Sequence, residues 1–186
     1  DVMVTVKPNP VVTTSGPYDV CSGQTTNIPL QSNVNGAQFT WTFNASSFVS
    51  GASNQNTPTT GSIQQTLSIP EQTPGLVTYI VQATAAGCQG PVKNIIVNVN
   101  PNPIANAGND QTVNYGTPVT LSGINSNGGT GTLSYAWSPC DPPIIPPCNT
   151  TTVTTTNLTQ TTTFTLVVTD TKQCSSTAQV TISVQG

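Results

Sequence analysis

Five cysteines and six carboxylates are the side chains in this sequence whose types could do chemistry. The chain has no histidine, so it lacks the commonest general base and the commonest transition-metal ligand. Glu71 is the only glutamate and cannot form a glutamate pair, and the five aspartates show no paired spacing. These residues argue against an enzyme, and they leave disulfide bonding as the chemistry to expect.

Low charge limits the partners of the protein. Only 5% of the 186 residues are charged and the net charge is −3, whereas ordinary soluble proteins carry roughly 25% charged residues. Three lysines cannot neutralise a nucleic-acid backbone, and no apolar stretch approaches the roughly 20 residues that span a bilayer. Because 34% of the residues are hydrophobic, we expect a folded chain with no nucleic-acid partner and no membrane insertion.

Internal repetition predicts two copies of one module. "VKPNP" at residues 6–10 returns as "VNPNP" at residues 99–103, and the landmarks between them keep the same order. "AQFTWTF" matches "LSYAWSP", and Cys88 aligns with Cys174. We therefore predict a first module at residues 7–99 and a second at residues 100–186.

Short strands separated by turns fill both modules. Val, Ile, Thr, Tyr and Phe dominate the runs, and Gly, Pro, Asn and Ser lie between them. The predicted strands are 10–14, 25–31, 37–44, 62–69, 76–84 and 92–99, then 103–106, 117–122, 132–137, 151–157, 162–169 and 176–184. About 90 residues with one tryptophan on the third strand predict an immunoglobulin-like β-sandwich. Trp41 and Trp137 are then core residues, with ligand stacking as the alternative.

The residues resemble a known family of repeats. The stretch "AGNDQTVNYGTPVTLSG…LSYAWSP…TTTFTLVVTD" from Ala107 is similar to PKD repeats, and "CSGQTTNIPL…FTWTF" from Cys21 resembles their cysteine-containing variant. Such PKD and PKD-like modules build large cell-surface adhesins of Bacteroidota, including gliding-motility adhesins. The "WDFGDG"-type signature of better-known PKD domains is replaced by "AWSPCD" from Ala136, so no role of those residues is transferred.

The first residues have the pattern of a last strand. Val2, Val4 and Val6 alternate with other residues as do the final strands of both modules, so residues 1–6 predict one orphan strand. One explanation is that the strand belongs to a preceding repeat of a longer array. The alternative is a donor strand that pairs with a neighbouring subunit in a fibre.

The cysteines predict two disulfides in a secreted chain. Cys21 and Cys88 precede the second and last strands of the first module, and we expect them to pair. Cys140 and Cys148 enclose a small ring, "DPPIIPP", worth about 2–3 kcal/mol. Cys174 has no counterpart to Cys21 in its module and is expected to be a free thiol; interchain pairing or exchange with Cys140 is the alternative.

Two weaker features suggest contact sites. Ile144 and Ile145 lie at the apex of the proline-restricted ring, where they form a rigid apolar tip or fold back onto the sandwich end. Asp110 and Asp170 are candidate ligands for a calcium site between loops, because carboxylates with backbone carbonyls suffice to bind calcium; solvated turn residues are the alternative. No other cofactor is expected.

The resemblance and the composition together imply a function. We expect a non-catalytic, extracellular stalk segment of a repetitive bacterial adhesin that presents a binding tip away from the cell surface. Its partners would be neighbouring repeats or identical subunits, and also a surface polysaccharide or protein. The alternatives are a fibre subunit assembled by strand donation and an accessory carbohydrate-binding module of a secreted hydrolase.

Overall fold

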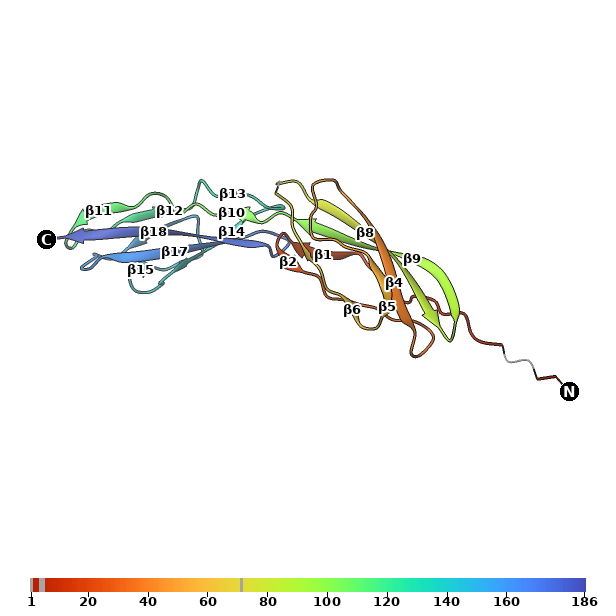
Figure 1. Cartoon of the computed structure of the whole chain (residues 1–186). Coiled ribbons are helices and arrows are strands. Elements are labelled where there is room, and N and C mark those ends of the chain that lie inside the picture. Colours follow the sequence, from red (N-terminus) through yellow and green to blue (C-terminus); the bar gives the residue numbers. More distant parts are fainter. Residues whose placement is uncertain (1, 4–5, 71) are drawn as a thin grey trace. The chain divides into compact units, whose positions relative to one another are not determined.

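The computed structural model describes residues 2–3, 6–70 and 72–186 and divides the chain into two compact units, Asp1–Asn100 and Pro101–Gly186. Within the described residues every regular element is a β-strand (Figure 1). None of the described residues forms a helix that is long and apolar enough to cross a membrane. Each unit is a two-layered sandwich with its own core, so the all-β, two-module prediction is confirmed.

The first module packs a five-stranded sheet against short strand pairs. The large sheet has the order β1-β9-β8-β4-β5, and the facing layer contains the pairs β2-β7 and β3-β6. The bounds are β1 Tyr18–Cys21, β2 Gln24–Thr25, β3 Ile28–Pro29, β4 Gln38–Ala45, β5 Gln55–Thr59, β6 Ser62–Ile63, β7 Thr66–Leu67, β8 Gly75–Ala85 and β9 Cys88–Asn100.

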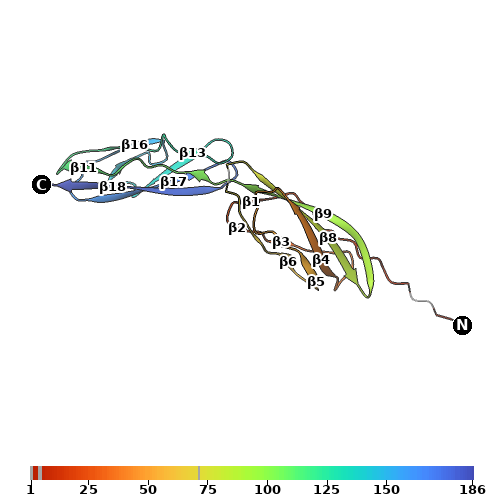
Figure 2. The same ribbon diagram turned by 45° about the horizontal axis from the view of Figure 1, so that its top comes forward.

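The second module repeats this arrangement with a smaller main sheet. That sheet has the order β11-β18-β17-β14, and the other layer contains β12-β16-β15 and the pair β10-β13 (Figure 2). The bounds are β10 Pro103–Ile104, β11 Gln111–Asn114, β12 Thr120–Ser122, β13 Asn127–Gly128, β14 Ser134–Ser138, β15 Ile144–Ile145, β16 Thr152–Thr155, β17 Thr162–Thr169 and β18 Ser175–Gln185.

Alternation along β8 and β17 explains both cores. In β8 every second residue is buried, from Val77 through Tyr79 and Val81 to Ala83, and in β17 Phe164, Leu166 and Val168 are fully buried. The residues between them face outward, as the two-residue period of a strand requires. One face of each strand therefore supplies the core, and the other face is left for solvent.

The first strand of each module switches layers. Residues 11–14 run along residues 29–33 of the small layer, where Thr13 N–H donates to Gln31 O at 2.9 Å. The chain then crosses over, and β1 pairs with β9 in parallel. In the second module β10 pairs with β13 before β11 pairs with β18, again in parallel.

Five strands of this architecture lie outside the predicted ranges, namely β1, β5 and β11 and the two-residue strands β13 and β15. β1 and β11 are short parallel edge strands of mixed polarity, and β5 is a polar edge strand that contains Pro58. Such edges bury too few side chains to produce a hydrophobic period. The predicted strand at 10–14 is an isolated bridge between Val12 and Ser32 with flanking hydrogen bonds.

Each tryptophan is buried at the same point of its sandwich. Trp41 is 6% exposed and Trp137 3%, and both belong to the cores. The indole Nε1–H of Trp41 donates to Ser53 O at 3.1 Å, and that of Trp137 donates to Thr150 O at 3.2 Å. The prediction that both are core residues is confirmed, because a buried indole needs one hydrogen-bond acceptor and finds it.

Tyr79 should make the first module sensitive to alkali. Its buried hydroxyl donates to Gln65 Oε1 at 2.7 Å, and burial raises the pKa of Tyr79 from 10.0 to about 12. Since the folded pKa lies above the unfolded one, the contribution of Tyr79 to stability is complete below pH of about 10 and is lost between about 10 and 12.

We expect Tyr79→Phe to remove this step. At neutral pH the variant loses about 1 kcal/mol with the hydrogen bond, and above pH of about 10 its unfolding free energy falls less steeply than that of the parent chain. Denaturant titrations from neutral to alkaline pH measure both effects. Tyr115→Phe is the control, because Tyr115 is 66% exposed and lies in the second module, so the change should leave the stability of the first module as it is.

Candidate functional site

The described residues among the first six form no strand with the first module. Val2, Met3 and Val6 are described, are 92%, 93% and 87% exposed, and belong to no sheet. Val4, the middle residue of the predicted orphan strand, lies outside the described residues. Lys7 is the first side chain with a described contact to the module, through Nζ to Ala86 O at 2.9 Å.

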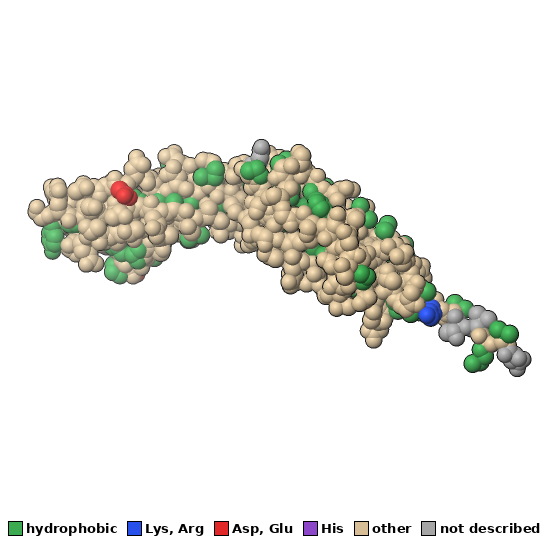
Figure 3. Space-filling model, in the orientation of Figure 1, with side chains coloured by type: hydrophobic (Ala, Val, Ile, Leu, Met, Phe, Trp, Pro, Cys, Tyr) green, Lys and Arg blue, Asp and Glu red, His purple; other side chains and the backbone are tan. Residues whose placement is uncertain are grey.

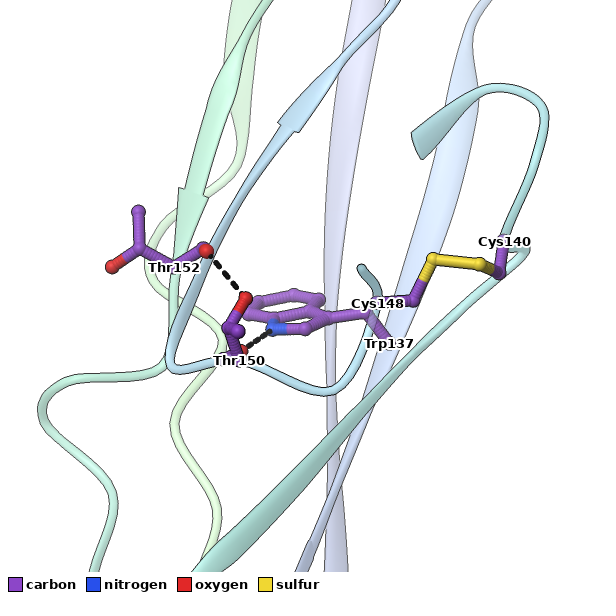
Figure 4. The surroundings of a disulfide bond; sticks show 5 residues. All are labelled: Trp137, Cys140, Cys148, Thr150 and Thr152. Atoms are coloured by element: carbon purple, nitrogen blue, oxygen red, sulfur yellow. Dashed lines mark hydrogen bonds between the residues drawn. A yellow bond between two sulfur atoms is a disulfide. The ribbon is translucent and has the colours of Figure 1, made fainter. Parts of the chain in front are cut away.

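The disulfide of the second module lies beside its tryptophan. Cys140 and Cys148 are bonded, with a Cα–Cα distance of 6.0 Å, as the sequence spacing predicts. Trp137 N–H donates to Cys148 O at 2.8 Å, and its indole reaches Thr150 (Figure 4). Thr150 Oγ1 in turn donates to Thr152 O at 2.8 Å. The ring thus fixes the backbone that satisfies both donors of Trp137.

The disulfide ring covers the edge of the second module's main sheet, as strand β5 covers β4 in the first module. β14 is an edge of its sheet, whereas β4 is covered by β5, with Trp41 paired to Gln55. In the second module the carbonyl of Cys148 meets the outward N–H of Trp137 instead. An open edge is a site for unwanted pairing, so the disulfide ring caps part of the β14 edge.

The two isoleucines of the ring have different environments. They form β15, which pairs with β16 through the partners Thr155 and Thr154. Ile144 is 0% exposed and belongs to the core, while Ile145 is 51% exposed. The prediction of a two-residue apolar tip is therefore wrong for Ile144, because strand alternation turns the two side chains to opposite faces.

Asp110 and Asp170 do not form a calcium site. Asp110 Oδ1 accepts from Thr181 N–H at 2.7 Å, whereas Asp170 Oδ1 accepts from Cys174 N–H at 2.9 Å. These partners are seven residues apart along the β18 segment, which corresponds to about 23 Å of extended chain. Across residues 2–3, 6–70 and 72–186, no three His, Cys, Asp or Glu residues are grouped to hold a metal ion.

Asp170 instead organises the turn between β17 and β18. Its side chain is 2% exposed and accepts three backbone N–H groups, from Thr130 at 2.7 Å, Lys172 at 2.8 Å and Cys174 at 2.9 Å. Gly129 has φ of +70°, and a Cβ there would lie 2.9 Å from Asp170 Oδ2. The sequence pattern missed this role, because a turn aspartate usually faces solvent.

The predicted pairing of Cys21 with Cys88 is wrong. β1 runs parallel to β9 and places Cys21 beside Asn100, the last residue of β9, while Cys88 is the first residue of that strand. Twelve residues of extended strand separate the two ends, which is about 40 Å, far beyond the reach of a disulfide. Cys88 is free and partly exposed.

The prediction of a free thiol at Cys174 is also wrong. Both Cys21 and Cys174 are disulfide-bonded. The prediction for Cys174 was based on the absence of a cysteine at position 114, the position in the second module that aligns with Cys21. The absence of a cysteine at that one position does not prevent Cys174 from forming a disulfide. Cys174 is 1% exposed at the start of β18 and accepts an N–H from Asp170 with its carbonyl.

The surface of the described residues is polar and shallow and carries few charges. Figure 3 shows scattered apolar side chains and few charges on the face that it draws. One groove, of about 430 Å³, lies over β4, β5, β8 and β9 and is lined by residues such as Thr42, Gln82 and Gln89. Another, of about 380 Å³, is lined by Pro142, Leu158 and their neighbours. Neither groove is lined by a charged residue among those described.

Comparison with known proteins agrees with the two-module division. The PKD-like domain family matches residues 18–103, and the K319L-like PKD domain family matches residues 107–184. No curated protein matches the chain.

Solved structures similar to this chain include a PKD domain, a pair of immunoglobulin domains and an N-cadherin. The PKD domain of the KIAA 1837 protein is 26% identical over 44% of this chain and 84% of its own, with a TM-score of 0.37. DIP-gamma IG1+IG2 is 14% identical over 96% and 99%, with a TM-score of 0.40, and Drosophila N-cadherin EC1-4 is 16% identical over 97% and 50%, with 0.37. The chain is a tandem of two PKD-like, immunoglobulin-type domains, at residues 18–103 and 107–184.

Proposed function

We propose that this chain is a non-catalytic stalk segment of a repetitive extracellular adhesin on a bacterial surface, where it holds a binding tip away from the cell. Tandem domains of this kind are typical of extracellular adhesion or stalk modules. The observation that carries the proposal is the position of the chain ends in each module. The chain enters every sandwich at one end and leaves it at the other.

In the first module, Lys7 contacts the β8–β9 turn at Ala86, and the chain leaves from Asn100 at the far end of β9. In the second, Ala105 N–H donates to Ser176 Oγ near the start of β18, and the chain leaves at the end of that strand, at Gln185. Strands of 13 and 11 residues span about 43 and 36 Å. Modules with this arrangement lengthen a chain when they are joined in series.

The parallel edge pairs suit such modules to tension. Pulling on the two ends of the second module draws β11 and β18 past each other, so their hydrogen bonds are loaded together rather than one at a time. Tyr115 N–H donates to Gln185 O at 2.8 Å. Because backbone groups alternate in direction along a strand, the backbone N–H groups of Val113 and Gln111 also point toward β18, and that of Thr112 points away from it.

We expect Val113→Pro to weaken the second module by about 1–2 kcal/mol and to lower its unfolding force, because proline removes a ladder N–H. Thr112→Pro is the matched control and should change both less, since its N–H faces outward. Val113→Ala measures the separate loss of packing. Equal effects of the two proline variants would contradict the role assigned to this pair.

Single-molecule pulling of the chain from its two ends, with its disulfides reduced, tests the proposed function. We expect two unfolding events, one for each module, at forces well above those of thermal agitation. A chain that extends smoothly without discrete events would be unfit to carry load, and the stalk proposal would fail.

A fibre subunit that donates residues 1–6 is the second candidate function, favoured by the exposure of Val2 and Val6. Sedimentation over a range of protein concentrations separates the two. Fibres that disappear when Val2 and Val6 are both changed to Ser support strand donation, whereas a monomer at all concentrations supports the stalk.

A further inference from the structure

The one free thiol among the described cysteines occupies a repeated position. Cys88 is the first residue of β9, directly after the β8–β9 turn, and Cys174 directly precedes β18, after the β17–β18 turn. The two residues thus occupy matching places in the two modules. Cys174 is disulfide-bonded, whereas Cys88 is free.

The surroundings of Cys88 lie at the N-terminal end of the first module. Ala86 and Gly87 form its turn with φ of 50° and 82°, and Lys7 donates to the carbonyl of Ala86. Pro10 O fills the space where Gly90 would carry a Cβ. The incoming chain is therefore held against the turn, and any module attached ahead of Lys7 is brought close to Cys88.

The C-terminal end of the first module carries the other cysteine. Cys21 pairs in register with Asn100, where the chain leaves the sandwich, and it is disulfide-bonded. Within one module the two cysteines are about 40 Å apart. The first module therefore has one cysteine at each end, and the two are too far apart to bond to each other.

We propose that Cys88 forms a disulfide with the C-terminal-end cysteine of another module of this kind, at the position that Cys21 holds here. Such bonds would join successive modules covalently, in addition to the peptide linker. The inference depends on the proposed function in one respect, namely that modules of this kind stand in a row. The partner module comes either from the same polypeptide or from a second copy.

The chemistry is a thiol–disulfide exchange with a disulfide oxidant such as oxidised glutathione. One thiolate attacks the oxidant and releases a reduced thiol, and the second cysteine then displaces the other half. The two cysteines lose two protons and two electrons in total. The oxidant accepts both electrons and leaves as two thiols.

A chain with one added module tests the proposal. A copy of residues 7–99 that carries Cys88→Ser is placed directly ahead of Lys7, so that Val99 of the copy takes the place of Val6. The extended chain then offers the copy's Cys21 and the original Cys88 as two unpaired thiols. After oxidation with oxidised glutathione, we expect no free thiol and a cross-linked peptide that joins these two residues.

The control changes Cys21 of the copy to Ser, and its Cys88 should end as a mixed disulfide with glutathione, with no cross-linked peptide. Two cysteines that stay free or each carry glutathione in the extended chain, or a bond between two Cys88 residues of different chains, would overturn the proposal. A copy's Cys21 bonded to Cys88 of a separate chain, seen as a dimer on non-reducing electrophoresis, supports the proposal and identifies a second copy as the source.

A second measurement does not require the added module. In the parent chain, Cys88 should form a mixed disulfide with oxidised glutathione, because a thiol that bonds another module must be accessible. A Cys88 that stays unmodified in the folded chain would also overturn the proposal. Neither result affects the pulling experiment, in which Cys88 plays no part, so the two proposals can fail separately.

Discussion

Replacing Asp170 with Ala is expected to lower the free energy of unfolding of the second module by about 4 kcal/mol. Three backbone N–H groups, those of Thr130, Lys172 and Cys174, donate to its buried carboxylate. A hydrogen bond to a charged group contributes about 1.5–3 kcal/mol, and donors that stay buried without an acceptor add a desolvation cost. Few other side chains in the module accept hydrogen bonds from so many backbone N–H groups.

Urea-dependent hydrogen exchange followed by mass spectrometry measures this loss, since its peptides report each module by itself. The first module is the internal control and should keep its stability. Asp110→Ala is the matched control, because Asp110 is exposed and accepts one N–H, from Thr181, so it should cost about 1 kcal/mol or less. Equal losses from both variants would contradict the organising role of Asp170.

If Asp170→Ala does not fold, Asp170→Asn provides the measurement. The asparagine side chain has nearly the same shape and keeps one oxygen that can accept a hydrogen bond. Its NH₂ group replaces the second oxygen and faces a backbone N–H that the carboxylate of Asp170 accepts in the parent chain. We expect an intermediate loss of about 2 kcal/mol. Calcium should not change the stability of the parent chain, and a calcium-dependent increase that Asp170→Asn abolishes would overturn the account of the turn.

Asp170 also shows which features of this structure cannot be predicted from the sequence. The order of landmarks was enough to predict two sandwiches with Trp41 and Trp137 in their cores, because core strands produce a hydrophobic period. A turn aspartate produces none, and its role appears only when residues forty positions apart, Thr130 and Asp170, come together. Three acceptor contacts within one loop cannot be inferred from spacing alone.

The cysteines give a second example. Both Cys21 and Cys88 precede predicted strands, and this order suggested that they meet at one end of the module. The parallel pairing of β1 with β9 places them at opposite ends instead. The short, half-polar strand β1 is not among the predicted strands. Without it, the sequence does not show at which end of the sandwich Cys21 lies. The ring of Cys140 and Cys148 was predictable because its closure is local.

The ring also carries the second large effect. We expect Ile144→Ala to destabilise the second module by about 3–4 kcal/mol, because Ile144 is fully buried and its removal leaves a cavity against the core. Ile145→Ala, one residue away and 51% exposed, should cost less than about 0.5 kcal/mol. The pair differs only in the face of β15 that each side chain occupies, so it isolates burial from position in the ring.

Hydrogen exchange of the β15–β16 pair, in both variants, measures the difference. Similar losses of stability in both variants would contradict the alternation of β15. The disulfide between Cys140 and Cys148 closes the ring that contains β15, so changing both cysteines to Ser should weaken the module by about 2–3 kcal/mol even with Ile144 present.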